Sequence, residues 1–258
     1  RPYEIRPDGN AAPIWIHEFG LMLPADLPDP DIEHLRPAFE EAFVRLFKAE
    51  IENDDFNRLV ILTGMAAEQI VVLRAYAKYM RQIGFSLSQA FIETTLAAHG
   101  SVALELIELF NMRFDPARAN IDDAAIEAKR LAIETTLEQV ENLSEDRVLR
   151  MYLCLIMATT RTNFWRRGQN GERRGFLSFK FDPATIPDLP APRPHFEIFV
   201  YSPRFEGVHM RGGAVARGGL RWSDRLEDFR TDRQEHRDRP GGLQGRVCPQ
   251  ETTGSRRS

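Results

Sequence analysis

Apolar residues recur at helical spacing from residue 31 to about residue 165. Polar residues occupy the positions between them, and short breaks separate one segment from the next. This is the pattern of amphipathic helices packed in a bundle. Candidate capping residues mark the N-termini of two predicted helices. Ser86 and Gln89 have capping-box spacing, and Ser144 precedes Glu145 and Asp146 as a candidate N-cap. The pattern predicts helices over 31–47, 66–83, a segment introduced by Ser86, 101–113, 122–141 and 144–165.

Strand-like patterns stand on either side of this helical region. The short apolar run 14–23 lies between prolines, and the segment 176–181 alternates apolar and polar residues. A proline-rich linker follows over 183–194, and two more strands are predicted at 196–201 and 207–210. The predicted fold class is therefore mainly α, a helical bundle-like segment with a few β-strands near 175–215.

The last stretch, residues 232–258, differs in composition. It contains six Arg and four acidic residues, and only Leu243, Val247 and Cys248 are apolar. Such a segment cannot bury enough apolar surface to offset the entropy of ordering. We predict a disordered C-terminal tail.

Overall composition narrows the function. The 258 residues carry 34 basic and 38 acidic side chains, and this net charge of −4 argues against a general nucleic-acid binder. The chain has two Cys and no CxxC pair, which indicates a reducing, cytoplasmic location rather than a disulfide framework. No apolar run is long enough to span a membrane. The first residue is Arg1 rather than Met, so a processed or partial product is expected.

The densest candidate chemistry lies between Arg211 and Arg225, where Gly pairs alternate with Arg. Glycine lets a backbone approach a ligand closely, and arginine binds carboxylates and phosphates through two hydrogen bonds. The segment therefore suits the binding of an anionic small molecule. A tight turn with solvated arginines is an alternative explanation of the same residues. Neither of the phosphate-binding motifs GxGxxG and GxxxxGK[ST] occurs in the sequence. The six His are scattered and no HExxH motif occurs, so no metal site is assigned. No catalytic residue is assigned either. Asp54 and Asp55 are interpreted as a helix N-cap rather than as an acid/base pair.

The segment 208–231, VHMRGGAVARGGLRWSDRLEDFRT, resembles the start of the catalytic domain of the large bacterial NAD-specific glutamate dehydrogenases. Four further segments resemble the family in the same order: LRAYAKYMRQIGFSLSQ at 73–89, TTRTNF at 159–164, LSFKFD at 177–182 and PDLPAPRPHFEIFVYSPR at 187–204. The resemblance covers essentially residues 1–231.

The resemblance implies oxidation of L-glutamate to 2-oxoglutarate and ammonia, with NAD as the cofactor of the parent enzyme. The family's [KR]-G-G-x-R segment matches Arg217, Gly218, Gly219 and Arg221. These are the implied substrate-binding residues. Arg217 would hold a substrate carboxylate, and the two glycines would let the backbone approach the substrate closely. Arg221 would bind substrate or form a structural ion pair.

The resemblance also implies a domain organisation. Residues 1–30 would end an upstream ACT-like module, 31–168 would form a helical domain, and 175–231 would be a truncated start of the catalytic domain. The parent is expected to be a homo-oligomer without nucleic-acid or membrane partners. The family's lysine-bearing loop and its dinucleotide-binding domain do not occur in these 258 residues, so the chain alone is expected to be inactive.

The tail permits a second interpretation. Codons allowed for 234–248 can be read one base later to give the family's lysine loop, so we interpret 232–258 as an out-of-frame segment, with a genuine basic tail as the alternative. Two functional alternatives also stay open: a non-catalytic helical interaction module, and an anion-binding regulatory domain that uses the Gly/Arg segment.

Overall fold

The computed structural model describes most of the chain between residues 31 and 212 and a short N-terminal piece. The described residues are 3–7, 12–18, 20, 31–118, 122–168, 171, 174–187, 189 and 193–212. The predicted substrate-binding residues Arg217, Gly218, Gly219 and Arg221, and the predicted tail 232–258, lie outside them.

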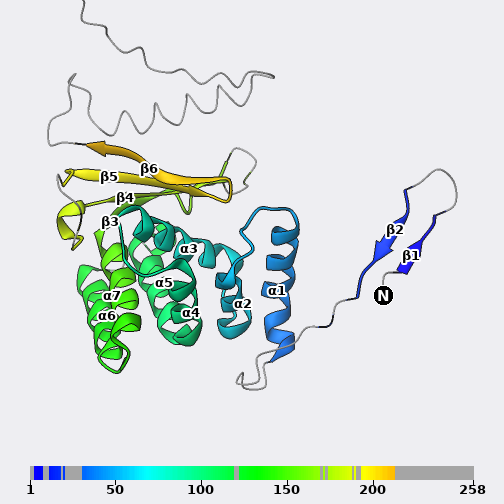
Figure 1. Ribbon diagram of the computed structural model, residues 1–258, viewed down its shortest axis with the longest axis horizontal. Helices are drawn as coiled ribbons and strands as arrows, with labels where there is room; N and C mark the ends of the chain where they lie inside the picture. Colours follow the sequence, from blue (N-terminus) through cyan, green and yellow to red (C-terminus); the bar gives the residue numbers. More distant parts are fainter. Residues whose placement is uncertain are drawn as a thin grey trace, which may run out of the picture. The chain divides into compact units, whose positions relative to one another are not determined.

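Seven α-helices occupy the region in which the sequence predicts helices (Figure 1). They are α1 (Ile32–Phe47), α2 (Arg58–Thr63), α3 (Ala67–Gln82), α4 (Gln89–Ala98), α5 (Gly100–Phe114), α6 (Asp123–Leu137) and α7 (Leu143–Ala158). Short 3₁₀ turns lie at Asp55–Asn57, Pro116–Arg118 and Pro183–Thr185. The prediction of a mainly α fold with a few strands is confirmed.

Two of the predicted helix starts are wrong by two residues. Ser88, not Ser86, caps α4: its hydroxyl accepts a hydrogen bond from the Phe91 amide at 3.2 Å. Asn142, not Ser144, caps α7, and its side-chain oxygen accepts from the Ser144 amide at 2.9 Å. In both cases a second polar residue nearby was the better-placed acceptor for the free N–H groups of the first turn.

Helix α7 also ends earlier than predicted, because the chain becomes strand β3 (Thr159–Thr162). Threonines are β-branched and favour extended backbone over helix. Pairing with β4 (Leu177–Phe181) then uses the backbone groups that a longer helix would have used, with Thr159 opposite Phe181.

A four-stranded sheet in the order β3-β4-β5-β6 lies beside the helices (Figure 1). Strand β5 (Phe196–Ser202) pairs antiparallel with β4, with Phe179 opposite Phe199, and β6 (Phe205–Gly212) follows after a two-residue turn. The predicted alternation in β4 is confirmed: Leu177, Phe179 and Phe181 are buried, and the residues between them are less so.

The helices and the sheet share one apolar core. Tyr76 of α3 stacks on Phe179 with ring centroids 4.3 Å apart, and Tyr79 stacks on Phe181 at 4.1 Å. The ring of Phe110, on α5, packs against the edge of Phe179. Such aromatic pairs bury large apolar areas in fixed geometries, so α3 and the sheet are held in one arrangement.

A separate two-stranded hairpin is formed by β1 (Tyr3–Ile5) and β2 (Ile14–Ile16), with Glu4 opposite Trp15. The sequence predicted the second strand, although as a longer element, and missed the first. Within the described residues, no single helix is long and apolar enough to cross a membrane, although the bent pair α4 and α5 passes on length and composition.

Candidate functional site

The described structure ends where the predicted substrate segment begins. Strand β6 runs to Gly212, and Arg217 comes five residues later in the chain. The described polar contacts that precede this segment in the chain are those around β6, between α3, the segment 50–57 and the last two strands.

Glu197 of β5 is the centre of the first group of contacts. Its side chain is fully buried, and one carboxylate oxygen accepts a hydrogen bond from the Tyr79 hydroxyl at 2.6 Å. The other oxygen lies 2.6 Å from Nε of Arg211, whose own side chain is half exposed. Burial, and next the hydrogen bond to Glu197, raise the pKa of Tyr79 above its ordinary value, so its hydroxyl stays a donor.

Lys78, one residue before Tyr79, is the centre of the second group. Its ammonium lies 2.8 Å from a carboxylate oxygen of Glu52 and 3.4 Å from one of Glu206, near the start of β6. The hydroxyl of Tyr201 donates to the other oxygen of Glu52 at 2.9 Å. Both ends of β6 are thus tied to charged groups that are largely withdrawn from water.

Arg74, one turn before Lys78 on α3, forms the third group. It binds both carboxylate oxygens of Asp54, at 2.6 and 2.7 Å, and the Asn57 side-chain oxygen at 2.9 Å. Burial by itself lowers the pKa of Arg74, but the hydrogen bond and charge of Asp54 outweigh it and raise the pKa. Asp54 does stand at the N-cap position of a 3₁₀ turn, yet its carboxylate makes no capping bond. Its role is to neutralise Arg74.

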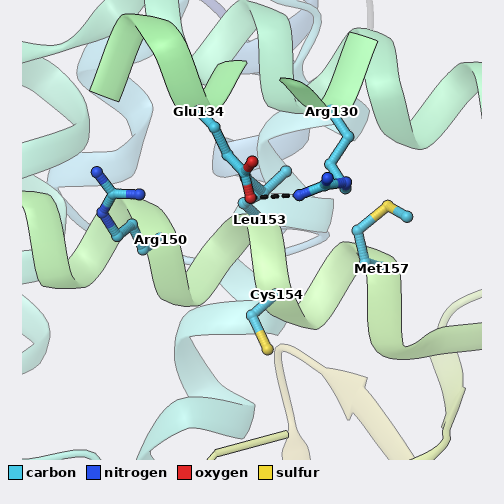
Figure 2. A pocket seen from close by; sticks show the side chains of 6 residues that line it. All are labelled: Arg130, Glu134, Arg150, Leu153, Cys154 and Met157. Atoms are coloured by element: carbon cyan, nitrogen blue, oxygen red, sulfur yellow. Dashed lines mark hydrogen bonds and ion pairs between the residues drawn. The ribbon is translucent and has the colours of Figure 1, made fainter. Parts of the chain in front are cut away.

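A pocket of about 200 Å³ lies between α6 and α7 (Figure 2). Arg130 and Glu134 line it from α6, and Arg150, Leu153, Cys154 and Met157 line it from α7.

Both arginines of this pocket already have carboxylate partners. Arg130 is paired with Glu134 and, at 2.6 Å, with Glu127, and Arg150 lies 2.8 Å from Asp146. Burial raises the pKa of the Cys154 thiol, which is the opposite of the shift that makes a reactive thiolate. The pocket is therefore a salt-bridged groove rather than a prepared anion site.

Three other sequence interpretations can be placed. His209 lies in β6, as predicted for a strand residue, with its ring 5.7 Å from that of Phe205. Glu145, predicted in the first turn of a helix, lies in the first turn of α7, and its carboxylate lies 2.8 Å from a ring nitrogen of His99. Among the described residues, no three His, Cys, Asp or Glu side chains lie together in a way that could hold a metal ion.

The sequence analysis missed the polar groups at the helix–sheet interface. A signal was present in the sequence. Arg74 and Lys78 are charged residues among the apolar residues of α3, and Glu197 is a charged residue among those of β5. Charged side chains at buried register positions need partners. The pattern does not say which partners, because Tyr79 and Glu197 lie 118 residues apart.

Comparison with known protein families gives the class to which this arrangement belongs. Residues 51–116 match the family model described as glutamate dehydrogenase, helical motif 3. Residues 132–234 match the model described as bacterial NAD-glutamate dehydrogenase, catalytic domain. The second match begins within α6, earlier than residue 175, where the sequence analysis places the start of the catalytic domain.

Three curated relatives carry the same name, NAD-specific glutamate dehydrogenase. The chain is 46% identical over 232 residues to the protein of Halomonas elongata and 47% identical over 234 residues to that of Pseudomonas aeruginosa. It is 42% identical over 239 residues to that of Mycobacterium tuberculosis. Each alignment covers 90% of this chain but only 14 or 15% of the relative. The resemblance is therefore confirmed: 90% of the chain matches bacterial NAD-specific glutamate dehydrogenases, and the chain spans about one seventh of these relatives' length.

Proposed function

We propose that this chain is the helical segment and the opening strands of the catalytic part of an NAD-specific glutamate dehydrogenase. The parent reaction converts L-glutamate, NAD⁺ and water into 2-oxoglutarate, ammonium and NADH. The observation that carries the proposal is the catalytic-domain match, which runs through residue 234 and so includes the Gly/Arg segment. A cytoplasmic location and a homo-oligomeric parent belong to the same proposal.

Within this proposal the Gly/Arg segment binds the substrate. Arg217 holds a carboxylate of glutamate or 2-oxoglutarate, Gly218 and Gly219 let the backbone come close, and Arg221 either adds a second contact or pairs within the protein. The guanidinium of arginine matches a carboxylate with two parallel hydrogen bonds, which orients the substrate as well as binding it.

The described residues do not fit NAD. A dinucleotide site needs parallel strands and a glycine-rich turn that leads into a helix. Here β3, β4 and β5 pair antiparallel, and no such turn occurs in the described ranges. In the proposal NAD, which accepts the hydride in the parent reaction, is therefore held by other parts of the parent enzyme.

The test is made on the 258-residue chain. We expect no glutamate-dependent increase in absorbance at 340 nm, because the residues for proton transfer and NAD binding are not in this sequence. We expect 2-oxoglutarate to raise the melting temperature. A ligand at about 100 times its Kd adds about 2.7 kcal/mol to the free energy of unfolding.

Two arginine variants locate the ligand. Arg217→Ala should abolish the stabilisation, whereas Arg150→Ala, in the pocket of Figure 2, should leave it unchanged. Loss of the effect in Arg150→Ala alone would mean that the anion binds between α6 and α7. Stabilisation that persists in Arg217→Ala would show that the substrate site is assigned to the wrong residues.

A further inference from the structure

A β-bulge makes two cations direct neighbours across the sheet. Thr159 of β3 lies opposite Phe181 of β4, but Arg161, two residues further along β3, lies opposite Lys180. Thr160 is the extra residue of the bulge, and its hydroxyl donates to the Lys180 carbonyl at 3.0 Å. In a regular ladder Thr160 would lie opposite Lys180. The bulge is therefore what gives Lys180 a guanidinium as its cross-strand neighbour.

Both cations lie on the face of the sheet that points away from the helices. Leu177, Phe179 and Phe181 of β4 are buried in the core that the sheet shares with the helices, so Lys180 points to the other face. Arg161 shares that face, because directly opposite residues of antiparallel strands point the same way. Arg161 is exposed and Lys180 is partly exposed, so small molecules in solution can reach the pair.

No carboxylate among the described residues is paired with either cation. Asp182, two residues after Lys180, accepts a hydrogen bond from the Ala184 amide at 3.0 Å, and Glu197 of β5 faces the helices, where α3 holds it. The Lys180 ammonium instead lies 5.0 Å from the centre of the Phe196 ring. Like charges directly opposite each other destabilise a sheet, and no described carboxylate offsets this repulsion.

The surroundings of Lys180 favour its neutral amine. Burial, and next the charge of Arg161, lower the pKa of Lys180 below its ordinary value. The chain contains three other lysines. Lys78 and Lys129 each have a carboxylate within 4.0 Å of the ammonium, and Lys48 is exposed to water, so the charged form is stabilised in all three. A lysine that is partly desolvated and next to another cation has the environment of a nucleophilic amine.

We propose that Lys180 is an acylation site for acyl phosphates, with Arg161 binding the phosphate group. The lone pair of Nζ attacks the carbonyl carbon, an amide bond forms, and the bond between that carbon and the phosphate oxygen breaks. Inorganic phosphate leaves with the electron pair of the broken bond, and Nζ gives its surplus proton to water. The guanidinium of Arg161 matches a phosphate with two hydrogen bonds. Acylation also neutralises Lys180 and so removes its repulsion from Arg161.

The test incubates the full 258-residue chain with acetyl phosphate and follows acetylation of each lysine by mass spectrometry. Lys129 is the internal control, because it is partly exposed like Lys180 but is paired with Glu105. We expect the initial rate at Lys180 to exceed that at Lys129 about threefold to tenfold. Arg161→Met should lower the Lys180 rate about tenfold, because it removes both the neighbouring charge and the phosphate contact, and should leave Lys129 unchanged.

A neutral acetyl donor, N-acetylimidazole, separates these two effects of Arg161. Arg161→Lys keeps the charge but loses the planar fork, so Lys180 should react at the wild-type rate with N-acetylimidazole and more slowly with acetyl phosphate.

Rates that follow exposure alone, with Lys48 fastest and Lys180 equal to Lys129, would overturn the proposal. An unchanged Lys180 rate in Arg161→Met would do the same. Equal losses with both donors in Arg161→Lys would refute the phosphate contact.

Discussion

Arg74 shows how much a single buried side chain can require of the residues around it. Its guanidinium is fully buried, lies 5.6 Å from the centre of the Phe56 ring, and uses Asp54 and Asn57 as acceptors. One of its nitrogens, Nη1, has no partner among the described protein atoms. A buried water would satisfy that nitrogen, since buried polar atoms rarely remain unbonded. One residue on α3 therefore bonds to the side chains at both ends of the 54–57 turn.

Gly84 gives a residue-scale prediction. It follows α3 with φ of +82°, a left-handed conformation that costs an L-residue about 1–2 kcal/mol, and no atom within 4 Å would touch an added Cβ. Gly84→Ala should therefore lower the free energy of unfolding by about 1 kcal/mol through backbone strain alone, because the smaller entropy of the unfolded alanine chain offsets part of the cost. Urea unfolding measures the change.

Gly84→Asn is the matched control for that experiment. Asparagine adopts the left-handed region more readily than alanine, so it should lose less stability although its side chain is larger. If Gly84→Asn proved as destabilising as Gly84→Ala, the positive φ would not be the cause.

At the scale of elements, the helix positions were predictable and their ends were not. Apolar periodicity located α1, α3, α5 and α7 because each buries one face in the shared core. The ends depend on which of several neighbouring polar side chains reaches a free N–H group, and on tertiary pairing. The switch from α7 to β3 is of the second kind, since its cause is the strand β4 that arrives about 20 residues later.

The N-cap of α4 provides the element-scale prediction. Ser88→Ala should lower the free energy of unfolding by about 1 kcal/mol, because the Phe91 amide loses its acceptor. Ser86→Ala should change it by less than about 0.5 kcal/mol, because the Ser86 hydroxyl only accepts an exposed contact from Arg147. Thermal or urea unfolding of the two variants compares them directly. A larger cost for Ser86→Ala would restore the original capping-box interpretation.

For the whole molecule, the prediction of substrate-binding residues rests on family resemblance alone, and no physical pattern in the sequence would have led to it. Alternating Gly and Arg predicts anion binding or a tight turn with equal force. Periodicity also could not predict the contacts of Glu197 with Tyr79 and Arg211, because these residues meet only when β5, β6 and α3 pack together.

The out-of-frame interpretation of residues 232–258 is a prediction about the whole gene product. The family match extends to residue 234, two residues beyond the change in composition at 232. Sequencing the encoding DNA across codons 225–258 and beyond should show the lysine-bearing loop continuing in the shifted frame. A shifted frame that closes soon after, with no related sequence behind it, would favour the helical interaction module instead.

The buried tyrosines set an alkaline limit on the folded chain. Tyr76, Tyr79, Tyr152 and Tyr201 are almost completely buried, and burial is the main cause that raises the pKa of each above its ordinary value of 10. Below pH 10 both the folded and the unfolded chain keep these protons, so stability does not depend on them. Above pH 10 the unfolded chain loses protons that the folded chain retains, and each tyrosine then lowers the free energy of unfolding by about 1.4 kcal/mol per pH unit.

Four such groups together remove about 5 kcal/mol per pH unit, which is comparable with the whole stability of a typical domain. We therefore expect cooperative unfolding within one or two pH units above pH 10, with tyrosinate absorbance at 295 nm appearing together with the loss of helical circular dichroism. Tyr152→Phe should reduce the slope of stability against pH by about a quarter, which separates the tyrosines from lysines that titrate in the same range. Tyrosinate absorbance that rises while the helical signal stays intact would show that these hydroxyls reach solvent without unfolding, and that the shared core of helices and sheet is looser than its stacked rings imply.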